Sequence, residues 1–303
     1  MPSGSERSST GLPRSVTSSD GLLLVDKPSG PTSHDVIDQV RRVLGLRRVG
    51  HAGTLDPFAS GLLLVLLGRA TRLAQFLVGL SKRYEGAIRL GVATETDDRT
   101  GTVTIRQDGA ERIPDSALQE AMTSLIGAQR QHPPAYSAKK VGGRRAYRLA
   151  RSGRTVELPA VDVEVFQFTP IAREGATVRF EALVSSGTYV RALARDLGDR
   201  LGCGAHLAEL RRTAVGSFEI GAAEPLATLG EPSTTVLPPL AAVSHLERRA
   251  LADDERDAAA HGRPIAAAAA PSTPIALVHS GQLVAVAERS GDALRPRVVL
   301  VDG

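Results

Sequence analysis

The stretch LRRVGHAGTLDPFASGLLLVLL, residues 46–67, decides how the rest of the sequence is interpreted. Residues 46–61, which precede the aliphatic run LLLVLL, are predicted to be a loop. In this loop, Gly50 and Gly53 permit backbone conformations closed to other residues. Pro57 pushes Asp56 towards an extended conformation. The aliphatic run predicts a buried strand, so Asp56 is expected at the edge of a core. On spacing alone, an ordinary Asp-Pro turn is favoured over a catalytic loop.

On either side of this stretch, the apolar spacing changes between the strand period and the helix period. Strands are predicted at 21–30, 82–91, 161–170 and 176–185, and helices at 31–45, 113–127 and 188–202. The first helix is expected to be capped by Ser33 and to end at Gly45. Because strands and helices follow one another irregularly, the order favours an α+β fold over a regular parallel βαβ arrangement.

Composition divides the chain into a tail and two domains. Residues 1–19 are rich in Ser, Thr, Gly and Pro without an apolar period, which predicts a disordered tail. After about residue 230, linker-like and alanine-rich segments surround a helix and turn at 245–265 and short strands near the end. We expect a main domain at 20–232 and a small β-rich domain at 240–303.

Length and composition exclude several classes of protein. The 303 residues are 42% hydrophobic, and Cys203 is the single cysteine, which excludes a disulfide framework and a cysteine-cluster zinc site. No apolar run approaches the roughly 18 residues of a membrane-spanning helix, and the first twenty residues lack the apolar region of a secretory signal. We therefore expect a soluble, cytoplasmic protein.

The positive charges are mostly arginine, and they concentrate in one stretch. The net charge is only +4, and the arginine excess fits either a coding bias or a phosphate-bearing partner. However, RQHPPAYSAKKVGGRRAYRLARSGR, residues 130–154, holds eight cations and no acid, with Tyr136 and Tyr147 between them. This pattern favours RNA or DNA binding over an ordinary solvated face.

Two further features bear on chemistry. Arg191 falls in the first turn of the helix predicted at 188–202, where it would keep a nearby buried aspartate ionised and lower its pKa by about 1–3 units. A metal site is an alternative, because histidines and aspartates cluster between His34 and Asp56. Their spacing fits no metal motif, and the chain has no nucleotide-binding fingerprint, so we expect neither metal nor cofactor.

Seven blocks resemble, in order, the signatures of the TruB family of bacterial tRNA pseudouridine-55 synthases. They are DKPSGPTSHDVI, RVGHAGTLDPFASGLL, KRYEGAIRLG, GVATETDDRTG, QHPPAYSAKKVGGRRAYRLAR, SSGTYVRALARDLG and HLAELRRTAVGSF. The resemblance implies a catalytic domain built on a mixed, largely antiparallel sheet flanked by helices, followed by a small PUA-like β-barrel. It also implies that the uridine at position 55 of the tRNA T loop is flipped out and isomerised to pseudouridine without a cofactor.

The resemblance also implies roles for individual residues. Asp56 corresponds to the attacking aspartate and Arg191 to its partner, while Tyr84 corresponds to the tyrosine stacked on the target base. His51 corresponds to the residue that fills the space left by the flipped nucleotide. Tyr189 and Leu210 correspond to residues of the base pocket. An insertion at 128–155 is implied to grip the T stem-loop, with Lys139, Arg144, Arg145 and Arg148 as candidate contacts.

Two alternatives belong to other classes of function. A tRNA-binding folding chaperone with secondary catalysis would bind the same RNA but would not depend on Asp56. A metal-dependent nuclease would use the His and Asp cluster and would be inhibited by EDTA. We expect a monomeric enzyme whose partner is tRNA.

Overall fold

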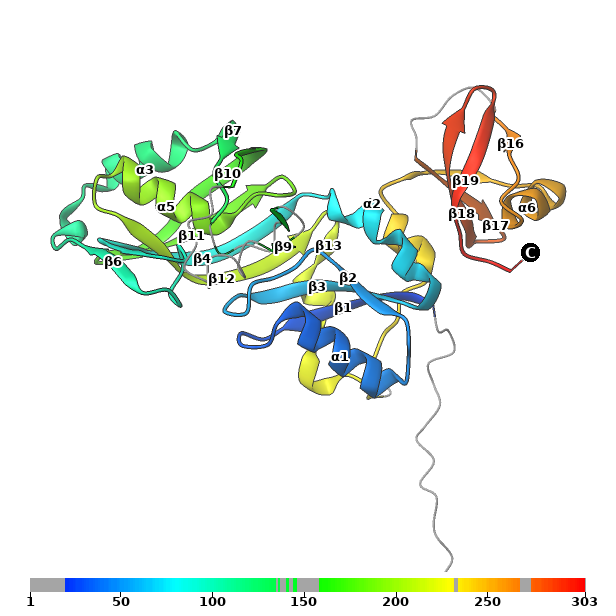
Figure 1. Cartoon of the computed structure of the whole chain (residues 1–303), viewed down its shortest axis with the longest axis horizontal. Coiled ribbons are helices and arrows are strands. Elements are labelled where there is room, and N and C mark those ends of the chain that lie inside the picture. Colours follow the sequence, from blue (N-terminus) through cyan, green and yellow to red (C-terminus); the bar gives the residue numbers. More distant parts are fainter. Residues whose placement is uncertain are drawn as a thin grey trace, which may run out of the picture.

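The structure is a computed structural model that describes residues 20–134, 136, 140, 141, 144, 145, 158–231, 234–267 and 274–302. The tail predicted at 1–19 lies outside the described residues. Figure 1 shows an elongated lobe built on a large sheet and a smaller lobe at the C-terminal end of the chain. No helix in the described part of the chain is long and apolar enough to cross a membrane.

The large sheet has ten strands within the described residues and runs in the order β14-β1-β3-β12-β4-β11-β10-β7, with β2 on β3 and β13 on β12. The pairs β1–β14 and β3–β12 are parallel and the others are antiparallel, which confirms the mixed, largely antiparallel sheet. The strands are β1 (Gly21–Lys27), β2 (Val49–Ala52), β3 (Ser60–Leu67), β4 (Lys82–Leu90), β7 (Gly127–Gln131), β10 (Val161–Glu174), β11 (Thr177–Val184), β12 (Ala205–Val215), β13 (Phe218–Glu219) and β14 (Glu224–Pro225).

Within the described ranges, helices and two small hairpins surround this sheet. The α-helices found there in the larger lobe are α1 (Ser33–Leu44), α2 (Ala74–Val78), α3 (Asp115–Thr123) and α5 (Val190–Arg200). The hairpins pair β5 (Val92–Thr94) with β6 (Val103–Arg106), and β8 (Lys140–Val141) with β9 (Arg144–Arg145). The 3-10 helices are η1 (Gly68–Leu73), η2 (Ala110–Arg112), η3 (Ile220–Ala222), η4 (Leu226–Thr228) and η5 (Pro239–Val243).

The aliphatic run at 62–67 forms the buried part of β3, as predicted. Leu62, Leu64 and Leu66 pack into one hydrophobic cluster, and the alternate residues pack into another on the opposite face of the sheet. Both faces of β3 are therefore covered, which explains why the run does not alternate between apolar and polar residues.

The close approach of β3 and β12 requires a glycine. Gly61 has φ +106°, and a Cβ there would lie 2.3 Å from the carbonyl oxygen of Arg212. Because only glycine tolerates both conditions, this position fixes the parallel pairing of Gly61 with Arg212. The pairing places the loop that precedes β3 against β12.

The loop predicted before LLLVLL is partly wrong, because it contains strand β2, in which His51 pairs with Val65. Gly50 is an ordinary strand residue, whereas Gly53 has φ +91°, a conformation that favours glycine, as predicted. The start of α1 also differs. Thr32, not Ser33, is the N-cap and forms a capping box with Asp35, while Gly45 ends the helix in the left-handed conformation as predicted.

In the part of the chain that the structure describes, the C-terminal lobe is a five-stranded sheet packed against one helix. The elements are β15 (Glu247–Ala250), α6 (Asp253–Ala260), β16 (Ile265–Ala266), β17 (Ile275–His279), β18 (Gln282–Ser290) and β19 (Ala293–Val299). The helix expected within 245–265 is therefore shorter and follows a strand. Among the described residues, the pairing runs from β15 to β16 without closing into a full barrel.

The two lobes share a hydrophobic cluster. Val286, Val298 and Leu300 of the C-terminal lobe belong to the same cluster as Leu22 and Leu64 of the large sheet. An ion pair between Arg69 and Asp302 also joins the two lobes. The small lobe is therefore packed onto the sheet rather than connected only through the linker.

Candidate active site

A pocket of about 270 Å³ opens in the middle of the large sheet. This volume lies just below the roughly 300–1,000 Å³ of pockets for drug-sized ligands, which suits a single planar ring. Its walls come from the loop before β3, from α2 and β4, from the β11–α5 turn and from β12. The lining residues are Gly53, Thr54, Leu55, Asp56, Val78, Lys82, Tyr84, Ser185, Gly187, Thr188, Tyr189, Val190, Arg191, Leu210 and Arg212.

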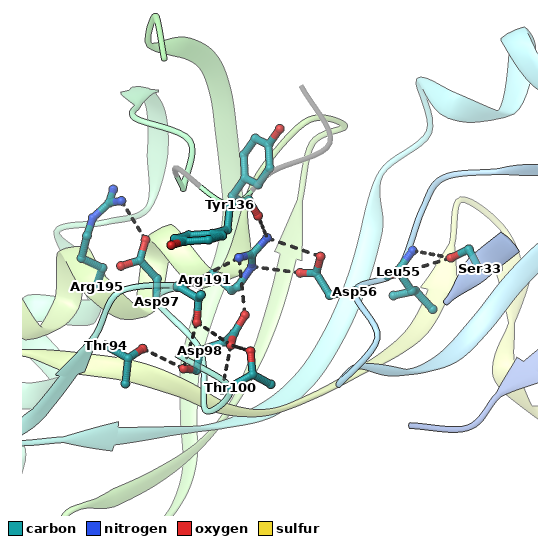
Figure 2. A network of polar contacts seen from close by, with 12 residues as sticks. Ser33, Leu55, Asp56, Thr94, Asp97, Asp98, Thr100, Tyr136, Arg191 and Arg195 are labelled. Carbon is teal, nitrogen blue, oxygen red and sulfur yellow. Dashed lines mark hydrogen bonds and ion pairs between the residues drawn. The ribbon is translucent and has the colours of Figure 1, made fainter. Parts of the chain in front are cut away.

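Asp56 and Arg191 face each other in this pocket (Figure 2). Nε of Arg191 lies 2.9 Å from Oδ2 of Asp56, and Nη2 donates to Oδ1 at 3.3 Å. The Arg191 side chain is 6% exposed and the Asp56 side chain 37% exposed. The guanidinium is therefore buried, while the carboxylate keeps an open side towards the pocket.

Arg191 is held by a second carboxylate behind it. Nη1 of Arg191 lies 3.4 Å from Oδ2 of the buried Asp98 and donates to the carbonyl oxygen of Thr96 at 3.0 Å. The other oxygen of Asp98 accepts hydrogen bonds from the hydroxyls of Thr96 and Thr100 and from the Thr100 backbone N–H. The remaining direction of the guanidinium is filled by the carbonyl oxygen of Tyr136, 3.1 Å from Nη2. Nε, Nη1 and Nη2 of Arg191 therefore all have acceptors, which fixes the orientation of the guanidinium.

Burial raises the pKa of the Asp56 carboxyl above its usual value, whereas the charge of Arg191 lowers it and the charge of Asp98 raises it. The combined effect is a raised pKa of Asp56. Arg191 therefore lowers this pKa, as expected, but the loss of solvation outweighs the ion pair.

The backbone of the loop that carries Asp56 is held by side chains from three other segments. Nζ of the fully buried Lys27 donates to the carbonyl oxygen of Pro57 at 3.4 Å and to two other proline carbonyls at 2.8 Å. Arg212 donates to the carbonyl oxygen of Gly53 at 3.0 Å. The hydroxyl of Ser33 bonds both backbone polar groups of Leu55, at 2.9 and 3.2 Å. Ser33, expected as a helix cap, is therefore used to anchor this loop instead.

The other predicted pocket residues are brought together as well. Tyr84 of β4, Tyr189 at the start of α5 and Leu210 of β12 all line the pocket with Asp56 and Arg191. These side chains add two aromatic rings and one aliphatic group to the lining of the pocket, which provides apolar contact for a flat ring.

His51 does not line the pocket. It lies on β2, where its ring meets that of His34 edge to face at 6.3 Å between ring centres. Burial lowers the pKa of His51, and the charges of His34 and Arg212 lower it further. Within the described residues, its Nδ1 has no hydrogen-bond partner.

The predicted basic contacts lie partly outside what the structure describes. Lys139 and Arg148 fall outside the described residues. Arg144 and Arg145 form β9, which pairs with β8 in a short hairpin. The hairpin belongs to the segment that leaves the sheet at the end of β7 and returns at the start of β10, where Gln131 pairs with Val161.

The alternative metal site is not supported by the positions of the side chains. Among the described residues, no three histidine, cysteine, aspartate or glutamate side chains are grouped so that they could hold a metal ion. Asp35 instead caps α1 through Thr32, and Asp38 pairs with Arg41 at 2.8 Å.

Four buried charged residues described at the site were not assigned roles from the sequence: Lys27, Asp98, Lys82 and Arg212. Asp98 stands between two threonines in TETDDRTG, a spacing that could have identified a carboxylate satisfied by its own loop. Lys82 and Arg212 line the pocket. Nζ of Lys82 donates to the carbonyl oxygens of Val78 and Leu80, and burial lowers its pKa to about 8. Nothing in the local sequence separates these two cations from surface cations.

Comparison with known proteins identifies the family. Residues 41–190 match the TruB family pseudouridylate synthase N-terminal domain, and residues 191–232 match the tRNA pseudouridylate synthase B C-terminal domain. The tRNA pseudouridine synthase B of Leifsonia xyli subsp. xyli is 46% identical over 289 residues, covering 92% of this chain and 95% of the relative. That of Thermobifida fusca is 46% identical over 292 residues, covering 92% and 98%.

Solved structures give the same result for the fold. A chain in an H/ACA RNP bound to a substrate RNA containing 2′-deoxyuridine matches with a TM-score of 0.72 and 25% identity, over 93% of this chain and 85% of that one. A chain in a Cbf5-Nop10-Gar1 complex matches with a TM-score of 0.72 and 28% identity over the same fractions. The chain belongs to the TruB family of pseudouridylate synthases.

Proposed function

We propose that this chain isomerises the uridine at position 55 of the tRNA T loop to pseudouridine, with Asp56 as the catalytic carboxylate. The observation that carries the proposal is the Asp56–Arg191 pair, in which a carboxylate with one open side faces a pocket for a single ring. Relatives that match nearly the whole chain carry the name tRNA pseudouridine synthase B.

The reaction breaks the N1–C1′ bond of the target uridine and forms a C5–C1′ bond. The proton on C5 leaves and N1 gains one, so the product is an isomer of the substrate. An ionised Asp56 serves either as a nucleophile or as a stabiliser of positive charge at the sugar. Arg191 contributes by keeping the carboxylate ionised and aimed, because it bonds both of its oxygens.

The detached base has to be held while it turns. Tyr84, Tyr189 and Leu210 enclose the pocket and supply stacking and apolar contact, which offsets part of the few kcal/mol needed to unstack the base. Tyr84 is also a candidate to assist removal of the C5 proton. We assign His51 to the space that the flipped nucleotide vacates in the RNA, outside the pocket itself. The apolar walls limit access of water that would otherwise hydrolyse an intermediate.

The substrate contact extends beyond the pocket. We assign the insertion at 128–155, with Lys139, Arg144, Arg145 and Arg148, to the phosphates of the T stem-loop. We place the catalytic domain at 20–232, where the family match also ends, and the PUA-like domain at 240–303. We expect a monomer, since the pocket is complete within one chain.

The test is to incubate the purified chain with unmodified tRNA transcript and to map pseudouridine by carbodiimide labelling followed by primer extension, because the isomerisation leaves the mass unchanged. Pseudouridine at position 55 with the wild type, and none with Asp56→Asn, supports the proposal. Activity retained by Asp56→Asn would contradict the assigned mechanism. RNA binding and folding activity without any pseudouridine would favour the chaperone alternative.

A further inference from the structure

The side-chain amide of Gln131 pairs with the backbone of Tyr189 in the wall of the pocket. Gln131 is the last residue of β7 and is 1% exposed. The Tyr189 N–H donates to its Oε1 at 2.8 Å, and its Nε2 donates to the Tyr189 carbonyl oxygen at 3.1 Å. One side chain thus satisfies both backbone polar groups of the residue from which α5 begins.

This contact matters because α5 lacks a cap of its own. Tyr189 is the N-cap residue, and its side chain makes no capping hydrogen bond. N-cap positions normally carry a small polar residue that fixes the first turn. Here the start of the helix is fixed from outside by Gln131, and Arg191 follows two residues later. The position of Arg191 relative to Asp56 therefore depends on a residue of another strand.

Two more hydrogen bonds join the same segment to the same helix. The carbonyl oxygen of His132 accepts from Nη2 of Arg195 at 3.1 Å, and that of Tyr136 accepts from Nη2 of Arg191 at 3.1 Å (Figure 2 shows the latter). Arg195 is also paired with Asp97 at 3.0 Å, so its guanidinium is fixed on the other side. These bonds all start between residues 131 and 136 and end within the first turns of α5.

In sequence, this segment is the beginning of the acid-free stretch at 130–154. Because Gln131 pairs with Val161 of β10, the chain leaves and re-enters the sheet at the same place. The connection from Gln131 to Arg191 is a short series of direct interactions rather than a long path through the core.

We propose that Gln131 is a positioning residue that holds the start of α5 and so fixes Arg191 relative to Asp56. The proposal rests on the proposed function and adds a residue that does not line the pocket. The buried amide keeps the start of α5 in register with the end of β7. Misplacement of a catalytic group by about 1 Å can cost about 100-fold in rate.

The experiment compares Gln131→Leu with Gln39→Leu under single-turnover conditions on tRNA, alongside measured tRNA affinity. Gln39 is a matched control, because it lies outside the insertion and its amide also bonds a backbone carbonyl, that of Leu226, rather than one of α5. For Gln131→Leu we expect the chemical rate to fall about 10- to 100-fold while tRNA affinity stays within about twofold. The acidic limb of its pH–rate profile should move to higher pH, because a displaced Arg191 lowers the pKa of Asp56 less. Gln39→Leu should change neither.

A conservative variant tests the role if Gln131→Leu folds poorly. Gln131→Glu can still accept from the Tyr189 N–H but cannot donate to its carbonyl, so its rate should lie between those of the wild type and Gln131→Leu. Equal rates for all variants, or a loss of affinity with an unchanged chemical rate, would overturn the proposal. Amide hydrogen exchange at 189–193 gives an answer independent of turnover: faster exchange in Gln131→Leu than in Gln39→Leu is expected, and equal exchange contradicts the role. An inactive wild type would instead contradict the proposed function.

Discussion

Nε and Nη2 of Arg191 meet the two carboxylate oxygens of Asp56 at 2.9 and 3.3 Å, in a contact that joins the loop before β3 to the first turn of α5. The two residues are far apart in the chain, and each is fixed by its own surroundings. Asp98 and two carbonyl oxygens hold the arginine, whereas Lys27, Ser33 and Arg212 hold the backbone of the aspartate loop. Such independent support is what a preorganised site requires.

Asp56→Asn should abolish pseudouridine formation and leave tRNA binding within about twofold, since the amide keeps the size of the side chain and the binding contacts lie elsewhere. Pseudouridine mapping and filter binding on the same preparation would measure both. A parallel loss of binding would show that Asp56 contributes to RNA affinity rather than to chemistry.

The same variant should be at least as thermostable as the wild type at neutral pH. Because the pKa of Asp56 is raised in the folded state, ionisation of this carboxyl favours the unfolded chain, and its cost grows as pH rises above the usual value of 3.8. Asn removes that cost. Thermal unfolding from pH 3 to pH 8 should show the difference in Tm moving in favour of Asp56→Asn as pH rises; a difference that moves towards the wild type over this range would contradict the raised pKa.

The rate should fall on the acidic side with a midpoint above 3.8, and Arg191→Lys should move that midpoint higher. Lysine cannot bond both carboxylate oxygens with a planar fork, so its lowering effect on the Asp56 pKa is weaker. Arg195→Lys is the matched control one turn along α5, because Arg195 pairs with Asp97 and Asp196. Its midpoint should match that of the wild type.

Lys27→Met should reduce the rate more than it reduces stability. Burial lowers the pKa of Lys27 from 10.5 to about 8, which corresponds to about 3 kcal/mol, and methionine removes this cost. Loss of the hydrogen bonds to the proline carbonyls costs a similar amount, about 1–3 kcal/mol. The free energy of unfolding in urea should therefore change by less than about 2 kcal/mol, while the rate falls at least about tenfold as Pro57 loses an anchor. An unchanged rate would mean that the loop needs no such support.

Neutralising Arg144, Arg145 and Arg148 together should weaken tRNA binding and flatten its salt dependence. Removing one phosphate interaction should reduce the slope of log K against log salt by roughly 0.7–0.9. The control replaces Arg106, Arg112 and Arg179, which are exposed arginines outside the basic stretch. Equal slopes for the two triple variants would show that the stretch does not bind phosphates.

The sequence predicted most of the fold because the long periodic segments carried strong signals. The strand 82–91 and the paired strands at 161–170 and 176–185 are present, and Gly45 ends the first helix. Strand β2 was missed because it is four residues long and its pattern is dominated by glycine and histidine. Short strands are defined by their partners, here β3, rather than by their own residues.

Sequence similarity predicted which residues would surround the pocket, and Asp56, Tyr84, Tyr189, Arg191 and Leu210 all line it, whereas His51 does not. The buried supports could not be predicted in the same way. Lys27, Lys82 and Arg212 are cations of a type normally found at the surface, and only the packing reveals that backbone carbonyls take up their charge. Whether the pKa of Asp56 is raised or lowered depends on burial, which cannot be deduced from the composition of the sequence.

Anchoring the aspartate loop through main-chain oxygens has an evolutionary consequence. Lys27 and Arg212 donate hydrogen bonds to backbone carbonyl oxygens, so these contacts do not depend on which side chains the loop carries. Exposed positions on that path, such as Thr54, are consequently free to change identity without re-aiming the carboxylate. Substitutions at the rim of the pocket can therefore change which substrates bind, in evolution or by design, while the Asp56 carboxylate keeps its position.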